Sequence, residues 1–405
     1  MIEQSLLLSC LDLIEEKEIK LLTWGDTSFY FNKSEIIELI KLKTSSGWED
    51  IFEELCEQSL IVEVKSSYTV DCYRSRMAEA IYLYSNLRQW FHGQDLRNAK
   101  TLVSDFRFIR RPRQYPNRNV PASIVISQLK EKLNISNERT KVLFSLLGEG
   151  RGSFNLSGFQ IRATERILDK YENHLSTSRP NHSTGTIVCS GTGSGKTLSF
   201  YLPALTQISQ NICSDQSNRV QILAIYPRKE LLKDQFNETF KQARLLDDYL
   251  LTNNKRKIKI GTFFGDTFDG DYLNDKIKFN AIEFDLLKCK CSGKLKWLEE
   301  DVKLKKEILT CSRCGNKIHE DEVALTRQSP APDILFTTTE MLNQHLANNK
   351  YNHLFGVDTN SPIPLVLLDE VHTYEGTTGA QTSYLLKRWM KRSENKPHFV
   401  GLSAT

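Results

Sequence analysis

One short segment constrains this chain more than any other, the octapeptide Ser190-Gly191-Thr192-Gly193-Ser194-Gly195-Lys196-Thr197. It follows an apolar run at residues 186–189 and precedes a helix-like run that starts at Leu198. Glycines let backbone N–H groups turn toward phosphate oxygens, and the positive end of a helix dipole favours the same anion. The octapeptide therefore predicts a phosphate-binding loop in which Lys196 contacts the β- and γ-phosphates and Thr197 binds Mg²⁺. Its expected nucleotide contacts are Gly191, Thr192, Gly193, Ser194, Gly195, Lys196 and Thr197.

A second chemical feature is the acidic motif Asp369-Glu370-Val371-His372, which ends the apolar run 364–368. A carboxylate at the end of a strand beside the loop can hold Mg²⁺ through water, and a second can orient and deprotonate the attacking water. We expect Asp369 to take the first role and Glu370 the second. His372 is expected to couple the nucleotide site to a second motor domain. With Lys196, these three are the predicted catalytic residues.

Apolar runs alternate with helical stretches from about residue 151 onward. Those at 186–189, 221–226, 333–336, 365–368 and 398–402 are apolar on both faces. Such runs are typical of a parallel sheet that helices cover on both faces. The sequence therefore predicts an α/β domain over residues 151–405. The stretch 271–330 breaks the alternation and is predicted to be an insertion.

The glycine-rich loop and the acidic motif together resemble the Walker A and Walker B elements of superfamily 2 DEAD/DEAH-box helicases. Four further segments fall in the order of that family: a Q motif at 156–163, motif Ia at 226–235, motif Ic at 337–342 and motif III, Ser403-Ala404-Thr405. Ser190 stands where the generic loop has its first glycine, and this family commonly has a small residue there. The resemblance implies that residues 151–405 form a RecA-like domain, the first of two in such a motor.

The resemblance also implies roles for residues outside the two main motifs. Gln160 would read the edge of adenine, with Phe159 packed nearby. Arg228, Lys229, Thr338 and Thr339 would contact a nucleic-acid backbone, and Ser403 and Thr405 would link hydrolysis to strand movement. The implied cofactors are ATP and Mg²⁺, and the implied partner is nucleic acid, with DNA expected.

Two further likenesses narrow the expectation. Residues 369–380 and Gly265-Asp266-Thr267 resemble a RecQ-related branch of DNA helicases with a DEVH-type box. The stretch from 73–79 to 111–116 is similar to helicase-like proteins of bacterial islands that insert 7-deazaguanine derivatives into DNA. This likeness implies a role in DNA modification and restriction of foreign DNA, with partner proteins from such a system.

The first 150 residues carry weaker signals. Residues 1–95 are predicted to form an N-terminal domain with two helices and a small hairpin at 60–70, which is compatible with a winged helix or with a generic helical lobe. Residues 96–150 are predicted to be a basic linker. Within it, arginines alternate with aromatic residues over 106–116. Such a run can grip phosphates and stack bases, although it is more often a solvated linker.

Four of the nine cysteines form two close pairs, Cys289-x-Cys291 and Cys311-x-x-Cys314. In a chain without a secretion signal, this spacing points to metal rather than to disulfides. Four thiolates can surround one Zn²⁺ tetrahedrally and leave no open position for water, so we expect a structural zinc site. Four unrelated reduced thiols are the simpler alternative. The insertion that carries the site is expected to be a wedge or a partner contact.

Composition excludes little else. No apolar stretch is long enough for a membrane helix, and the N-terminus lacks the features of a signal peptide, so a cytoplasmic protein without a membrane partner is expected. The net charge of +4 permits nucleic-acid binding without requiring it.

The leading hypothesis is an ATP-dependent DNA helicase or translocase. A non-motor module that binds nucleic acid or proteins and an RNA helicase are the alternatives. The 405 residues end at motif III, before a second RecA-like domain. Because that domain supplies the arginine finger and further backbone grips, we expect this chain alone to bind ATP weakly and to hydrolyse it slowly.

Overall fold

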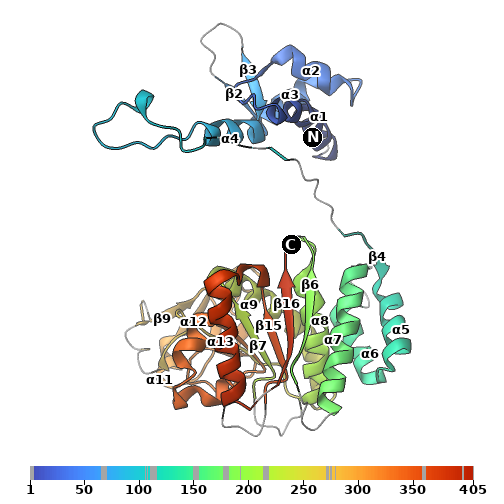
Figure 1. Ribbon diagram of the computed structural model, residues 1–405. Helices are drawn as coiled ribbons and strands as arrows, with labels where there is room; N and C mark the ends of the chain where they lie inside the picture. Colours follow the sequence, from blue (N-terminus) through green and yellow to red (C-terminus); the bar gives the residue numbers. More distant parts are fainter. Residues whose placement is uncertain are drawn as a thin grey trace. The chain divides into compact units, whose positions relative to one another are not determined.

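The chain divides into two compact units, Met1–Arg113 and Gln114–Thr405, in a computed structural model (Figure 1). The structure describes residues 4–64, 71–104, 106, 108–109, 116–148, 155–176, 182–191, 193–212, 219–270, 273, 276–278, 280–357, 362–394 and 396–404. Most of the arginine-aromatic segment at 106–116 therefore lies outside the described residues. Each unit has its own hydrophobic core and is described by itself.

The first unit has the element order of a winged helix. Its elements are α1 (Gln4–Thr23), β1 (Phe31–Asn32), α2 (Lys33–Lys41), α3 (Trp48–Glu57), β2 (Ile61–Val64), β3 (Cys72–Ser75) and α4 (Arg76–Ser85). The strands form an antiparallel sheet in the order β1-β3-β2. Apolar residues at helical spacing, such as Ile36, Ile40, Ile51 and Leu55, fill the core because they fall on the inner faces of α2 and α3.

The exposed face of α3 is acidic. Glu49, Asp50, Glu53 and Glu57 are exposed, and this helix contains no lysine or arginine. In helix-turn-helix proteins the corresponding helix enters the major groove. Carboxylates on that face would be repelled by phosphates, so this surface of the winged helix is unsuited to binding nucleic acid.

The second unit is built on a seven-stranded parallel sheet in the order β13-β8-β14-β7-β15-β16-β6. The strands are β6 (Thr184–Cys189), β7 (Ile222–Tyr226), β8 (Ile260–Phe263), β13 (Val323–Ala324), β14 (Ile334–Thr338), β15 (Leu365–Leu368) and β16 (His398–Ser403). Strands β7, β8 and β14 are almost entirely buried, because helices cover both faces. The predicted α/β, RecA-like architecture is confirmed.

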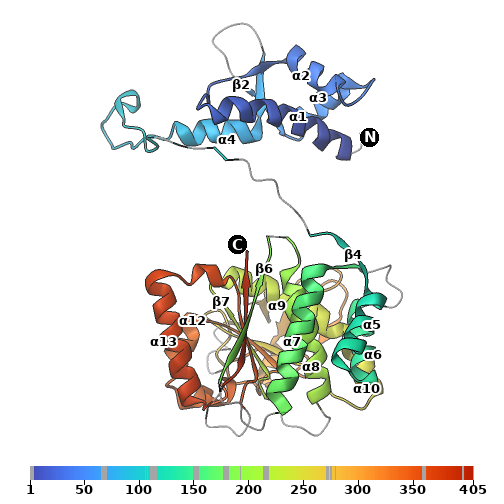
Figure 2. The same ribbon diagram turned by 45° about the vertical axis from the view of Figure 1, so that its right-hand side comes forward.

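Two layers of helices enclose this sheet. In Figure 2, α12 (Thr339–His345) and α13 (Gly376–Arg392) lie on one face, and α7 (Gly158–Ser176), α8 (Lys196–Asn211) and α9 (Lys229–Ala243) lie on the other. A short helix, α10 (Asp247–Thr252), follows α9. No helix among the described residues is both long and apolar enough to span a bilayer.

The predicted linker at 96–150 is wrong as a single unit. Residues up to 113 belong to the first unit, whereas α5 (Ala122–Leu133) and α6 (Asn137–Leu147) belong to the second. Val125, Leu129, Val142 and Leu146 are buried in the core of the second unit beside α7 and α8. A two-stranded sheet of β4 (Arg118–Pro121) and β5 (Asn155–Ser157) joins this helical pair to α7. The helices were missed because their polar residues conceal a narrow apolar stripe.

The insertion forms a small antiparallel sheet in the order β12-β11-β10-β9. Its elements are β9 (Ala281–Phe284), β10 (Leu295–Leu298), α11 (Glu299–Lys303), β11 (Leu309–Cys311) and β12 (Lys317–Ile318). Its predicted end at residue 330 is too late, because β13 at 323–324 already pairs with β8 in the main sheet. The buried Trp297 and Phe284 pack around Phe268, which follows β8, and this contact anchors the insertion.

Candidate active site

The parallel strands bring the predicted motifs to one edge of the main sheet. Strands β15, β16 and β6 are neighbours, so the segments after their carboxyl ends lie together. The backbone N–H of Ser190 donates to the carbonyl of Ser403 at 3.1 Å, and that of Asp369 donates to Ile225 at 3.1 Å. The glycine-rich loop, the acidic motif and motif III therefore meet.

The loop between β6 and α8 is shaped to surround an anion. Gly193 and Gly195 have φ angles of 75° and 88°, in the left-handed region where glycine is favoured. Helix α8 begins at Lys196, and the Lys196 ammonium is buried with no hydrogen-bond acceptor in the described part of the chain. A buried cation without an acceptor is costly, and phosphate oxygens would supply the missing acceptors. Thr192, a predicted contact, lies outside the described residues.

Gln160 lies against this loop. Its Oε1 accepts from the backbone N–H of Ser157 at 2.9 Å and from the Ser157 hydroxyl at 3.0 Å. Its Nε2 donates to the carbonyl of Gly195 at 3.1 Å. The family resemblance implied that Gln160 reads adenine. In this structure most of the hydrogen-bonding capacity of its buried amide is directed to the protein, so Gln160 holds the loop in place.

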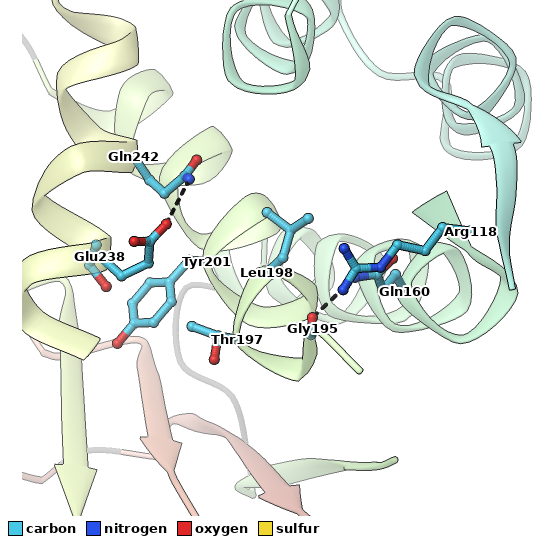
Figure 3. Close-up of a pocket in the computed structure, with 9 residues that line it drawn as sticks. Arg118, Gln160, Gly195, Thr197, Leu198, Tyr201, Glu238 and Gln242 are labelled. Carbon is cyan, nitrogen blue, oxygen red and sulfur yellow. Dashed lines mark hydrogen bonds between the residues drawn. The ribbon is translucent and has the colours of Figure 1, made fainter. Parts of the chain in front are cut away.

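Arg118 is a site residue that the sequence analysis missed. It comes from β4, far from the loop in sequence, and its Nη2 donates to the carbonyl of Ser194 at 3.2 Å. Figure 3 shows Arg118 and Gln160 together beside Gly195. They line a pocket of about 250 Å³ whose other walls come from α8 and α9: Thr197, Leu198, Tyr201, Glu238, Thr239 and Gln242. This pocket adjoins the loop and offers space and polar groups for the rest of a nucleotide.

The acidic motif has a strained backbone and is in contact with motif III. Burial raises the pKa of Asp369 to about 6, while the Glu370 backbone N–H, which donates to its Oδ1 at 2.9 Å, and the nearby Lys196 lower it. Glu370 itself is left-handed, with φ 48° and ψ 49°. His372 Nδ1 lies 3.3 Å from Glu370 Oε2 and 3.3 Å from Ser403 Oγ. His372 thus physically connects the acidic motif to motif III, whose Thr405 lies outside the described residues.

The four predicted backbone-contacting residues lie on neighbouring strand ends. Tyr226 of β7 pairs with Thr338 of β14, which places Arg228 and Lys229 beside Thr338 and Thr339. The Thr338 hydroxyl accepts from the Met341 N–H at 3.3 Å, so it caps α12. The segments that follow β7 and β14 thus reach the same edge of the sheet. The Thr338 hydroxyl already makes one hydrogen bond there, in the helix cap.

A carboxylate competes with any phosphate for the lysines of α9. Asp266, in the turn after β8, accepts from Lys233 Nζ at 2.7 Å and lies 3.8 Å from Lys229 Nζ. The Lys233 hydrogen bond lowers the pKa of Asp266, so this carboxylate is ionised at neutral pH. Binding of a phosphate to these lysines therefore requires the loss of an existing contact.

We expect Asp266→Asn to tighten the binding of single-stranded nucleic acid severalfold, because removing the carboxylate frees Lys229 and Lys233 for phosphates. Fluorescence anisotropy with a labelled strand at low salt measures this effect. Asp234→Asn, at an exposed position on the same helix, is the matched control for the change in net charge. Equal tightening by both variants would show that net charge alone is responsible.

The four cysteines of the insertion form a compact cluster. Their four sulfur atoms all lie within 4.8 Å of one another, and the sulfurs of Cys289 and Cys314, and of Cys291 and Cys311, are each 3.5 Å apart. A tetrahedral Zn²⁺ with Zn–S bonds of about 2.3 Å separates its sulfurs by about 3.8 Å, so the cluster fits this ion. Backbone N–H groups of Cys314 and Arg313 lower the pKa of Cys311 to about 6, which favours its thiolate, whereas burial raises the pKa of Cys289.

Gly293 makes the cluster possible. A Cβ atom at this position would lie 2.6 Å from the Cys311 sulfur and 3.2 Å from the Cys291 sulfur. Any larger residue would push the two pairs of cysteines apart. Glycine is therefore required where the two cysteine-bearing turns approach each other.

This fold and this edge define a RecA-like nucleotide-binding domain with a phosphate-binding loop. Residues 159–265 match the family model described as DEAD/DEAH box helicase. Over these residues the chain is similar to DEAD/DEAH box helicases.

Comparison with individual proteins gives more distant similarities. The uncharacterized ATP-dependent helicase MJ1574 of Methanocaldococcus jannaschii is 26% identical over 222 residues, covering 54% of this chain and 23% of that protein. The crystal structure of the DUF1998 helicase MrfA bound to DNA and AMPPNP is 22% identical, with a TM-score of 0.38 over 67% of this chain and 26% of that one. The yeast DEAD-box splicing factor Prp28 is 17% identical, with a TM-score of 0.39 over 72% and 48%. The chain spans about a quarter of the length of the first two relatives.

Proposed function

We propose that this chain is the ATP-binding part of an ATP-dependent helicase or translocase, and that its substrate is DNA. The observation that carries the proposal is the buried ammonium of Lys196 at the start of α8, which has no hydrogen-bond acceptor among the described residues and lies near the buried carboxylate of Asp369. A phosphate group with its Mg²⁺ would satisfy both charges at once. The match of residues 159–265 to the helicase family model supports coupling to unwinding.

Each residue of the edge has a place in this proposal. Lys196 and the backbone of the loop bind the β- and γ-phosphates, and Thr197 and Asp369 would hold Mg²⁺. When bound, Mg²⁺ would supply positive charge that offsets the negative charge on the transferred phosphoryl group. Glu370 orients and deprotonates the attacking water, and its hydrogen-bond distance to His372 connects that step to Ser403.

The Glu370→Gln variant should separate binding from hydrolysis. Because glutamine keeps the shape of the side chain but cannot take a proton, we expect nucleotide binding within about twofold of the unchanged chain and a loss of hydrolysis of about a hundredfold or more. A fluorescent ATP analogue measures the first quantity and phosphate release measures the second. Hydrolysis at the unchanged rate would exclude Glu370 as the general base.

The choice of DNA rests on the likeness of residues 369–380 to the RecQ-related branch. The direct test compares stimulation of ATP hydrolysis by single-stranded DNA and single-stranded RNA of the same length. Stronger stimulation by DNA supports the proposal, and stronger stimulation by RNA replaces it with an RNA helicase. Strand binding without any stimulated hydrolysis, even when a second RecA-like domain is supplied, supports a non-motor binding module.

The wider context is a narrower proposal that rests on sequence likeness alone. A cytoplasmic enzyme of bacterial DNA modification or defence, working with proteins of that system, would agree with the stretch from 73–79 to 111–116. A complete motor would combine this domain with a second RecA-like domain that supplies the arginine finger. We therefore expect hydrolysis by the 405-residue chain to rise when that second domain is added.

A further inference from the structure

We propose that the insertion is a second nucleic-acid contact, in which the cysteine end of its small sheet binds the phosphate backbone of a single strand. This inference rests on the proposed function, because it extends the strand-binding edge of the main sheet. The contact surface consists of five exposed side chains, called here the basic knuckle: Lys288, Lys290, Lys294, Arg313 and Lys317.

The folding of the insertion gathers these five residues at one end. Lys288 and Lys290 flank Cys289, and Arg313 lies between Cys311 and Cys314 in sequence. The Arg313 Nη1 donates to the carbonyl of Cys291 at 3.0 Å, which brings the two metal-binding turns together. Antiparallel pairing of β10 with β11 and of β11 with β12 then places Lys294 and Lys317 at the same end of the sheet.

The basic knuckle keeps a net positive charge after the negative charges beside it are counted. Four thiolates and one Zn²⁺ carry two net negative charges, which neighbouring cations must offset. Lys294 is already paired with Glu283 at 3.1 Å, and Asp285 follows β9 at the same end. The other four cations have no carboxylate partner within the described part of the chain, and they exceed the remaining negative charge.

The opposite end of the same sheet has no such excess. Helix α11 begins with Glu299, Glu300 and Asp301, and Lys303 is paired with Glu299 at 2.6 Å. Lys305 and Lys306 follow immediately, so cations and carboxylates are about equal there. Positive charge is therefore concentrated on the side of the metal site, where a polyanion would bind.

The basic knuckle also continues a line of lysines on α9. The backbone N–H of Lys288 donates to Asn237 Oδ1 at 2.9 Å. Lys229, Lys233 and Asn237 are four residues apart and so share one face of α9, rising by about 6 Å for each interval. A strand that contacts Lys229 and Lys233 at the sheet edge would thus meet the knuckle about 12 Å along the helix axis. This continuity favours a nucleic-acid strand over a separate protein partner.

The test compares two charge-matched triple variants of the full chain. Lys288→Gln, Lys290→Gln and Arg313→Gln together neutralise the knuckle, whereas Lys303→Gln, Lys305→Gln and Lys306→Gln neutralise exposed lysines at the α11 end. Anisotropy of a labelled 20-nucleotide poly-dT strand is measured over a range of salt concentrations. We expect the knuckle variant to bind about tenfold more weakly at low salt. The slope of log affinity against log salt should become shallower by about 2, because each lost phosphate contact removes about 0.7. The control should stay within about twofold.

Further outcomes are equally decisive. Zinc content equal to that of the unchanged chain shows that the knuckle variant keeps its metal site, and Lys288→Arg with Lys290→Arg should keep full affinity. Equal affinity and slope in both triple variants would overturn the inference and leave the proposed ATP site intact. The unchanged chain could also bind the strand but fail to bind nucleotide. If the knuckle variant then loses strand binding, the inference is supported and the proposed function is contradicted. A chain that binds no strand at all would contradict both.

Discussion

Replacing Lys196 by alanine is expected to abolish nucleotide binding. The Lys196 ammonium is buried at the start of α8 without an acceptor among the described residues, and the carboxylate of Asp369 is nearby. Charge-assisted hydrogen bonds to phosphate are among the strongest polar contacts, and removing one partner leaves the phosphate charge uncompensated in a partly buried site. We expect a loss of affinity of about a hundredfold or more, which corresponds to about 3 kcal/mol.

Titration calorimetry or a fluorescent ATP analogue measures this loss directly. Thermal unfolding of the apo chain supplies the control, because alanine removes an unsatisfied buried cation and should leave stability unchanged or slightly raised. Lys170→Ala, at a half-exposed position on α7 beside Asp169, is the matched control for the loss of one lysine. Unchanged nucleotide affinity in Lys196→Ala would mean that the loop does not bind phosphate, and the proposed function would be wrong.

The strands of the main sheet were largely predictable because burial on both faces leaves a simple sequence signal. Five expected apolar runs correspond to β6, β7, β14, β15 and β16. Strand β8 was not expected, because Gly261 and Thr262 interrupt its apolar character. The structure explains the glycine: a Cβ atom on Gly261 would lie 2.9 Å from the Ala324 Cβ and 3.0 Å from Pro332 Cγ. Close packing against a neighbouring strand thus concealed β8.

The candidate site was predictable only where local motifs define it. Lys196 and Asp369 belong to short segments whose chemistry is visible in the sequence, and the parallel sheet brings them together. Arg118 and Asp266 act on the site through contacts that depend on distant pairing, of β4 with β5 and of α9 with the turn after β8. No spacing rule along the chain reports such contacts. The contacts of the Gln160 amide with Ser157 and Gly195 likewise depend on folding and are not visible in the motif.

The expected result with the largest structural effect concerns the metal. Cys289→Ser should remove zinc from the insertion, because three thiolates and a hydroxyl bind Zn²⁺ far more weakly than four thiolates. Metal binding contributes about 10–16 kcal/mol to the folding of small zinc domains. The sheet β9–β12 has a modest core centred on Trp297 and Leu295, and α11 is short, so the loss of zinc should unfold the cysteine end locally. The main sheet has its own core and should remain folded.

Three measurements check this prediction on the full chain. Elemental analysis should give one zinc per unchanged chain and almost none for Cys289→Ser, since the cluster has four ligands for a single ion. Limited proteolysis should cut the variant between residues 281 and 318, and chelation of the unchanged chain should expose the same sites and make its cysteine thiols reactive. Cys56→Ser, in the winged helix and outside the cluster, is the matched control and should keep its zinc. If Cys289→Ser kept a full complement of zinc, the four sulfurs would be reduced thiols packed together, and the basic knuckle would lack the metal that organises it.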